Sequence, residues 1–145
     1  MAITQAIANA FKKQLLEGDA NFASGGDVFK LALYKSTATL NSATTAYAST
    51  NEVANSGQYT AGGGDLTGQN TSIASGVAIV DFADLSFTGV TLTARGALIY
   101  NTSSAVTNAA VAVLDFGADK TATSGTFTVQ FPAFTTAAAI LRISG

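Results

Sequence analysis

The stretch LSFTGVTLTARGALIY, residues 85–100, decides the fold class of this chain. Its apolar residues alternate with polar ones, first at Leu85 and Phe87 and then, one position out of step, from Val90 onward. An alternation of period two is typical of a half-buried β-strand. Gly89 lies where the alternation changes step, so we expect a β-bulge there that returns the later side chains to the same face.

Other segments with the same period surround this stretch, and they indicate about seven or eight strands joined by short connections. They are residues 29–34, 77–82, 109–116, 126–131 and 139–143, with short strands also expected near Tyr59 and Leu66. Within the stretch itself we expect two strands, residues 85–95 and 97–100. Parallel strands would require longer crossovers than these gaps allow. We therefore predict one domain over residues 1–145 with an all-β fold, an antiparallel β-sandwich of jelly-roll or immunoglobulin-like type over residues 27–145.

The chain begins with a segment of helical period, residues 2–17. Its apolar stripe consists of Ile3, Ile7, Ala10, Phe11 and Leu15. This pattern predicts an N-terminal amphipathic helix. Such a helix caps the open end of its own sandwich, docks in a groove of another subunit, or lies on a membrane surface. We favour the first, and in the second Ile3, Ile7 and Phe11 are the predicted partner contacts.

Residues 36–76 form a long loop-rich excursion composed mostly of Ser, Thr, Ala, Asn and Gly. Loops of this length in a compact domain are usually functional or disordered when free. We expect the segment to be mobile in isolation and fixed by a partner. Tyr47 and Tyr59 are large side chains among small ones, which makes them further candidate contact residues.

Several classes of function are excluded by composition. The chain has no cysteine and no histidine, so it has no disulfide, thiol nucleophile, Ser-His-Asp triad or zinc finger. Seven basic and nine acidic residues give a net charge of −2 and a pI near 4.7, which provides no basic surface for nucleic acid. No apolar run is long enough for a membrane span. We expect neither nucleic acid nor membrane as a partner.

The remaining polar motifs predict no catalytic, cofactor or metal residue. The pairs Asp81/Asp84 and Asp115/Asp119 would suit acid–base chemistry only across a substrate cleft. We expect these acids to cap turns or to pair with nearby basic side chains, with a weak calcium site at Asp81 and Asp84 as the alternative. The glycine-rich residues 61–68 lack the lysine of a phosphate-binding loop and are interpreted as a loop or hinge.

Charged residues make up only 11% of the chain, against a usual share of about 25%. Ala, Thr, Gly and Ser, at 28, 20, 14 and 12 residues, account for about half of it. A hydroxyl-rich surface costs less to desolvate than one rich in Lys and Glu, and the cores of interfaces are depleted of charge. We interpret the chain as one that packs against other protein, including further copies of itself as a dimer or trimer.

Six segments resemble a family of small bacteriophage virion structural proteins in order and spacing across nearly the whole chain. They are MAITQAIANAFKKQLLEG (1–18), FKLALYKSTATL (29–40), TNEVANSGQYTAGG (50–63), LTARGALIYN (92–101), AVLDFGADK (112–120) and FTVQFP (127–132). The resemblance implies a component of the virion, assembled in the host cytoplasm, with no catalytic residues and no cofactor.

Small β-sandwich proteins of this size resemble capsid cement or decoration proteins, which bridge and stabilise subunits of the major capsid protein. We therefore expect a non-enzymatic cement protein whose partners are the major capsid protein and other virion proteins. A tail, neck or fibre component is the alternative. A carbohydrate-binding module is less favoured, because the chain has no tryptophan on which a sugar could stack.

Overall fold

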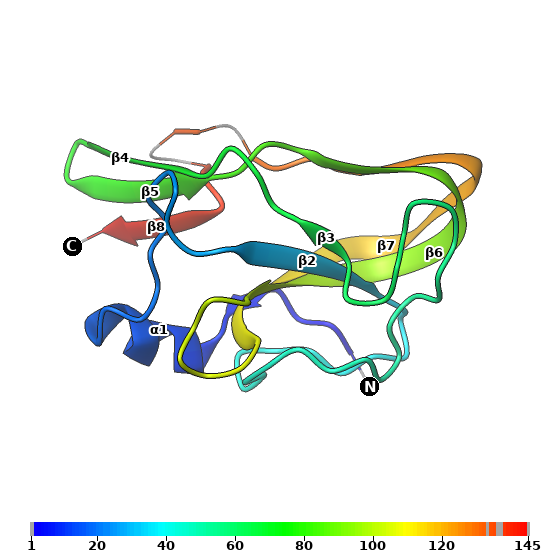
Figure 1. The fold of residues 1–145 in the computed structure, drawn as a ribbon, viewed down its shortest axis with the longest axis horizontal. Helices are drawn as coiled ribbons and strands as arrows, with labels where there is room; N and C mark the ends of the chain where they lie inside the picture. The colour runs from blue at the N-terminus through cyan, green and yellow to red at the C-terminus, as the bar shows by residue number, and fades with distance from the viewer. Residues whose placement is uncertain (1, 133, 136–137, 145) are drawn as a thin grey trace.

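The computed structural model describes residues 2–132, 134–135 and 138–144, which form two antiparallel β-sheets and one short helix (Figure 1). The elements are β1 (Ala6–Ile7), α1 (Asn9–Leu16), β2 (Phe29–Tyr34), β3 (Gly64–Asp65), β4 (Asn70–Ala74), β5 (Val77–Asp81), β6 (Leu85–Asn101), β7 (Ala109–Val129) and β8 (Leu141–Ser144). One sheet has the order β1-β7-β6-β2-β3 and the other β4-β5-β8. The predicted all-β, sandwich-like fold with an N-terminal helix is confirmed.

Strands β6 and β7, of 17 and 21 residues, form one long antiparallel ribbon. Figure 1 shows it running along the upper layer, bending at the end of the molecule away from α1, and returning beside β2. The pairing changes register between Phe87 and Val90, and Gly89 has a φ of +63°. The bulge expected at Gly89 is therefore present, and it keeps Phe87 and Val90 both in the core.

A second irregularity lies in the middle of the ribbon, where residues 116–119 of β7 face Arg95 alone. The Arg95 Nε donates to Asp115 Oδ1 at 3.0 Å, and the Gly117 N–H donates to the same oxygen at 2.9 Å. Both bonds hold the pKa of Asp115 below its usual value. Residues 85–95 and 97–100 were predicted as separate strands, but they form the single strand β6. The extra residues at this irregularity lie in β7, so β6 continues without a break.

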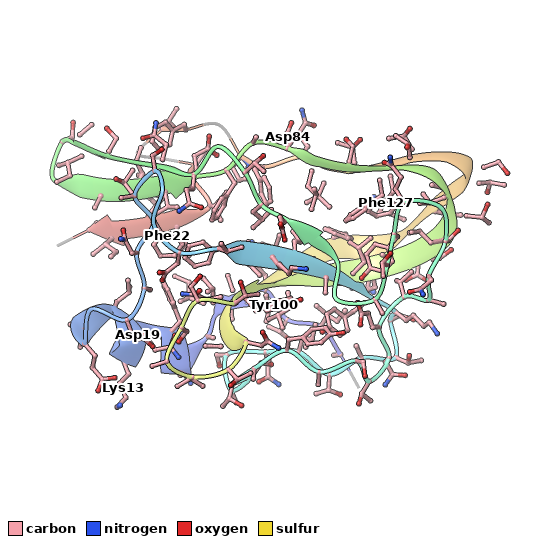
Figure 2. All side chains as sticks on the ribbon, viewed as in Figure 1. Lys13, Asp19, Phe22, Asp84, Tyr100 and Phe127 are labelled. Atoms are coloured by element: carbon pink, nitrogen blue, oxygen red, sulfur yellow. The ribbon has the colours of Figure 1, made fainter. Side chains whose placement is uncertain are left out.

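The core is aromatic at the end of the molecule that carries α1. Phe22 stacks on Phe29 with ring centroids 4.4 Å apart, and both rings contact Phe82. Figure 2 shows Phe22 between α1 and the sheets. All three side chains are buried. Phe22 thus joins the segment that follows the helix to the interior of the β-structure.

The helix is shorter than predicted, because strand pairing replaces its first two turns. Ile3 bridges Leu40, and β1 pairs with the edge of β7 through Ala6 and Ile7. Ala8 is extended, its N–H donates to the Val111 carbonyl at 2.9 Å, and α1 begins only at the next residue. The edge of β7 offers hydrogen-bond partners that an isolated helix lacks, which explains why the prediction over residues 2–17 is wrong before residue 9.

The first part of the 36–76 excursion packs against its own chain. Leu40, Val53, Tyr59 and Leu66 are all buried in the core. This part of the segment therefore already has, within its own chain, the packing partners that we expected a particle to supply. Strand β4 is different, because all five of its residues are exposed.

Candidate functional site

The β4-β5-β8 sheet carries an apolar face. In its register, Thr71 of β4 lies opposite Val80 of β5, and Ile73 lies opposite Ala78. On the other side of β5, Val80 lies opposite Leu141 of β8, and Ala78 lies opposite Ile143. Because side chains on a strand alternate between faces, one face carries six side chains of which five are apolar. They are Thr71, Ile73, Ala78, Val80, Leu141 and Ile143. All six line one groove between this sheet and α1.

The opposite wall of the groove comes from the N-terminal segment. Ile7, Phe11 and Leu15 contribute from β1 and α1, and Phe22 contributes from the segment that follows. Phe11 and Phe22 meet edge to face with ring centroids 5.7 Å apart, so this wall is built on the buried core. The groove has a volume of about 600 Å³. That volume lies within the usual range for sites that bind small ligands or inserted side chains.

Large apolar side chains at the groove remain uncovered. Ile73 is 77% exposed and Ile143 is 60% exposed. Single exposed apolar residues are ordinary, but two on one apolar face beside an open groove are typical of an interaction site. We therefore take the groove as the candidate functional site.

Two basic side chains, Lys12 and Arg142, are among the described residues that line the groove, and none of those residues is acidic. The Lys12 ammonium donates to Asn9 Oδ1 at 3.3 Å. A ligand with an apolar body and a carboxylate would complement this surface better than a cationic one.

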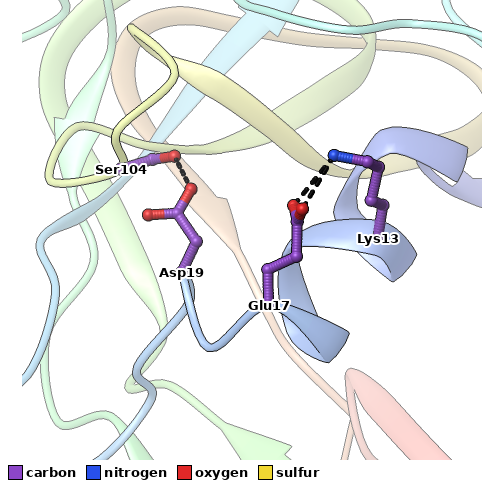
Figure 3. A network of polar contacts seen from close by, with 4 residues as sticks. All are labelled: Lys13, Glu17, Asp19 and Ser104. Carbon is purple, nitrogen blue, oxygen red and sulfur yellow. Dashed lines mark hydrogen bonds and ion pairs between the residues drawn. The ribbon is translucent and has the colours of Figure 1, made fainter.

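Polar contacts fix the helix that forms one wall (Figure 3). The Asp19 carboxylate accepts from the Ser104 hydroxyl at 2.6 Å and from the Ala105 N–H at 3.0 Å, and these bonds lower the pKa of Asp19. This joins the chain just after α1 to the connection between β6 and β7. Lys13 and Glu17 form an exposed ion pair at 2.9 Å along the helix. Such a pair contributes little to stability, so the Asp19 contacts matter more for the position of α1.

The predicted contact residues divide between the groove and the core. Ile7 and Phe11 line the groove, but Phe11 is buried and Ile7 half-buried. Ile3 is buried beside Leu40, away from the groove lining. The apolar residues Ile3 and Phe11 of the predicted stripe thus pack against the chain's own interior.

Tyr47 and Tyr59 point into a polar cluster of their own chain around Glu52, a buried carboxylate with 7% exposure. Tyr47 donates to Glu52 Oε2 at 2.6 Å, and Tyr59 donates to Oε1 at 2.8 Å. The Gly62 N–H also donates to Oε1 at 2.6 Å. Tyr59 is fully buried, so it is unavailable to a partner.

The cluster perturbs the pKa of every tyrosine in the chain. Burial, reinforced by the negative charge of Glu52, raises the pKa of Tyr100 to about 12. Burial is also the main reason why the pKa values of Tyr34, Tyr47 and Tyr59 are raised. Their pKa values are raised further than that of Tyr100. These are structural tyrosines, because each hydroxyl bonds within the chain.

Two of the acids considered for chemistry are held by contacts of their own chain. The Asp84 carboxylate accepts from the Phe131 N–H at 2.9 Å, and Asp115 pairs with Arg95 as expected, although it lies inside β7 and not at a strand end. In the part of the chain that the structure describes, no three carboxylates gather as a metal site.

Within the glycine-rich loop, a Cβ at Gly63 would lie 1.8 Å from the Leu31 carbonyl oxygen, so this glycine permits close approach of β3 to β2.

Sequence reasoning missed both the groove and Glu52. The alternation at residues 77–81 and 141–143 predicts strands, but it does not say that these two strands pair with each other. Glu52 is one carboxylate in a loop, and nothing near it in the sequence marks it as buried. Ser75-Gly76, a two-residue connection in which both residues have positive φ, is a local signal that could have indicated the β4–β5 hairpin. The pairing of β5 with β8 joins segments about 60 residues apart, and a single sequence does not show it.

Comparison of the chain with known protein families, with curated proteins and with solved structures finds no match. Over the described residues, no helix combines the length and the apolar character needed to cross a bilayer.

Proposed function

We propose that this chain is a non-enzymatic structural protein of a bacteriophage particle, a cement or decoration protein that bridges neighbouring subunits of the major capsid protein. The low charge of the chain and its hydroxyl-rich composition support a protein that lies against other protein. The resemblance of its six segments to small virion proteins supports the particle as the place.

The observation that carries this proposal is the uncovered apolar groove between α1 and the β4-β5-β8 sheet. Among the described residues that line it, none is acidic, and Lys12 provides an exposed ammonium group. By charge complementarity, its occupant is a segment of the capsid protein that presents apolar side chains and a carboxylate. Because Ile143 is 60% exposed, its complete burial in such an interface would contribute about 1–2 kcal/mol.

Quantitative staining of purified virions tests the proposal. A cement protein is expected in a fixed ratio to the major capsid protein, at copy numbers that follow the symmetry of the shell. A tail, neck or fibre component would be present in far fewer copies. Absence of the protein from purified virions would overturn the proposal.

Replacement of Ile143 by Lys is expected to reduce retention on the particle at least about tenfold, because an ammonium in an apolar interface costs more than the roughly 1.4 kcal/mol that a tenfold change represents. Ile143 is 60% exposed, so the free protein should fold normally. The measurement is the amount of protein bound per particle after purified protein is added to virions that lack it.

Val106→Lys is the matched control, because Val106 is 51% exposed but lies outside the groove lining. It should bind as the unmodified protein does. Equal binding by the two variants would show that the groove does not face the capsid.

A further inference from the structure

Strand β4 is an unprotected sheet edge. It pairs with β5 on one side, and all five of its residues are exposed. Proteins usually protect such an edge with a charge, a proline, a bulge or a very short strand. The sequence of β4, NTSIA, has no charge and no proline, and its pairing with β5 has no register shift. The opposite edge, β8, contains Arg142, whereas β1 and β3 have two residues each.

We infer that β4 pairs with β4 of a second copy of this chain, antiparallel and centred on Ser72. The two three-stranded sheets then form one continuous sheet of six strands across a two-fold axis. Centring on Ser72 is the register in which all five residues of each β4 have a partner. It places Asn70 opposite Ala74 and Thr71 opposite Ile73 of the second copy.

The side chains of β4 favour β4 of a second copy as its partner. Residues directly opposite each other in antiparallel strands share a face, so Ile73, which is 77% exposed in one copy, packs against Thr71 of the other. Pairs of β-branched side chains are favourable in sheets. A two-fold axis perpendicular to the sheet also brings both grooves to the same side, where they join into one apolar surface.

Charge does not oppose the pairing. The carboxylate nearest to β4 in the sheet is Asp81, opposite Asn70 on β5. From strand dimensions, the two Asp81 residues of the dimer lie about 19 Å apart, beyond the Debye length of about 8 Å at physiological salt. A protein edge with acidic or basic residues of one sign would repel its own copy, but this edge carries none.

A cysteine scan of β4 tests this register directly, because the chain has no native cysteine. Under mild oxidation of purified protein, Ser72→Cys is expected to form a covalent dimer, since opposite Cβ atoms lie about 4.5–5.5 Å apart. Asn70→Cys alone should not, because the two introduced residues would lie about 14 Å apart. The double variant Asn70→Cys with Ala74→Cys should cross-link again.

Light scattering of the purified chain gives the second readout. The unmodified protein is expected at twice 14.6 kDa, Ile73→Lys as a monomer, and Val106→Lys as a dimer. A monomeric unmodified protein at high concentration overturns the inference, as does cross-linking of Asn70→Cys in preference to Ser72→Cys. These measurements use free protein, so their outcome does not depend on whether the chain belongs to a virion.

Discussion

Replacement of Glu52 by Ala is expected to lower the free energy of unfolding by about 3–5 kcal/mol, because it leaves one buried and two half-buried donors without their acceptor. The Gly62 N–H loses its 2.6 Å partner. As a donor, the Tyr59 hydroxyl keeps only a 3.5 Å contact with the Leu33 carbonyl. For a domain whose whole stability is of the order of 5–15 kcal/mol, this is a large fraction.

Urea denaturation followed by circular dichroism measures the effect. Glu52→Gln is the control, because its amide oxygen can still accept from Tyr59 and the Gly62 N–H; the expected loss is about 1–2 kcal/mol. Tyr59→Phe should lie between the two, since the Leu33 N–H then loses the hydroxyl that accepts from it at 2.8 Å. An alanine variant as stable as the unmodified chain would show that the cluster does not stabilise residues 36–64.

Alkaline unfolding is the second large effect that we expect. A tyrosine ionises near pH 10 in an unfolded chain, and folding raises the pKa of all four tyrosines here. A pKa that is raised by folding contributes stability that is complete below the unfolded value and is lost as the pH rises through the folded value. The protein should therefore lose stability progressively as the pH rises above 10. In a chain that is still folded, Tyr100 would ionise with a pKa of about 12.

The measurement is the ultraviolet absorbance of tyrosinate during a pH titration, beside circular dichroism. The chain has no tryptophan, so the tyrosine signal is not obscured. We expect one steep rise in absorbance that coincides with loss of β-structure, because ionisation requires the cluster to open. Reversible ionisation of several tyrosines near pH 10 in a folded chain would contradict this expectation. Tyr47→Phe should leave the coincidence unchanged and reduce the amplitude.

The ribbon at the centre of the fold could be predicted from residues 85–100, because alternation and a glycine are local signals. The step in the pattern at Gly89 indicates the bulge without any knowledge of the partner strand. The N-terminal helix could be predicted only in part. Its apolar spacing also suits a strand followed by a helix, and pairing of Ala6 with Val113 decided between the two.

The candidate site depended in part on a pairing that a single sequence does not show. The Ser75-Gly76 connection is a local signal for the β4–β5 hairpin that carries Ile73, but the pairing of β5 with β8, which adds Ile143 to the same face, joins segments far apart in the sequence. Tyr47 and Tyr59 were recognised as unusual, but the partner expected for them was another protein. A carboxylate of the same chain satisfies both hydroxyls, and such a contact arises only once the loop folds back over β2.

The pairing of β1 with β7 has a consequence for the order of folding. Residue 6 leaves the ribosome early but hydrogen-bonds beside residue 113, so the N-terminal strand has no partner until most of the chain has been synthesised. Contacts of such long sequence separation slow folding because the loop must close before they form. The β6–β7 hairpin can form first, because its strands are adjacent in the chain. Strand β1 can then pair with the formed β7, and α1 packs after it.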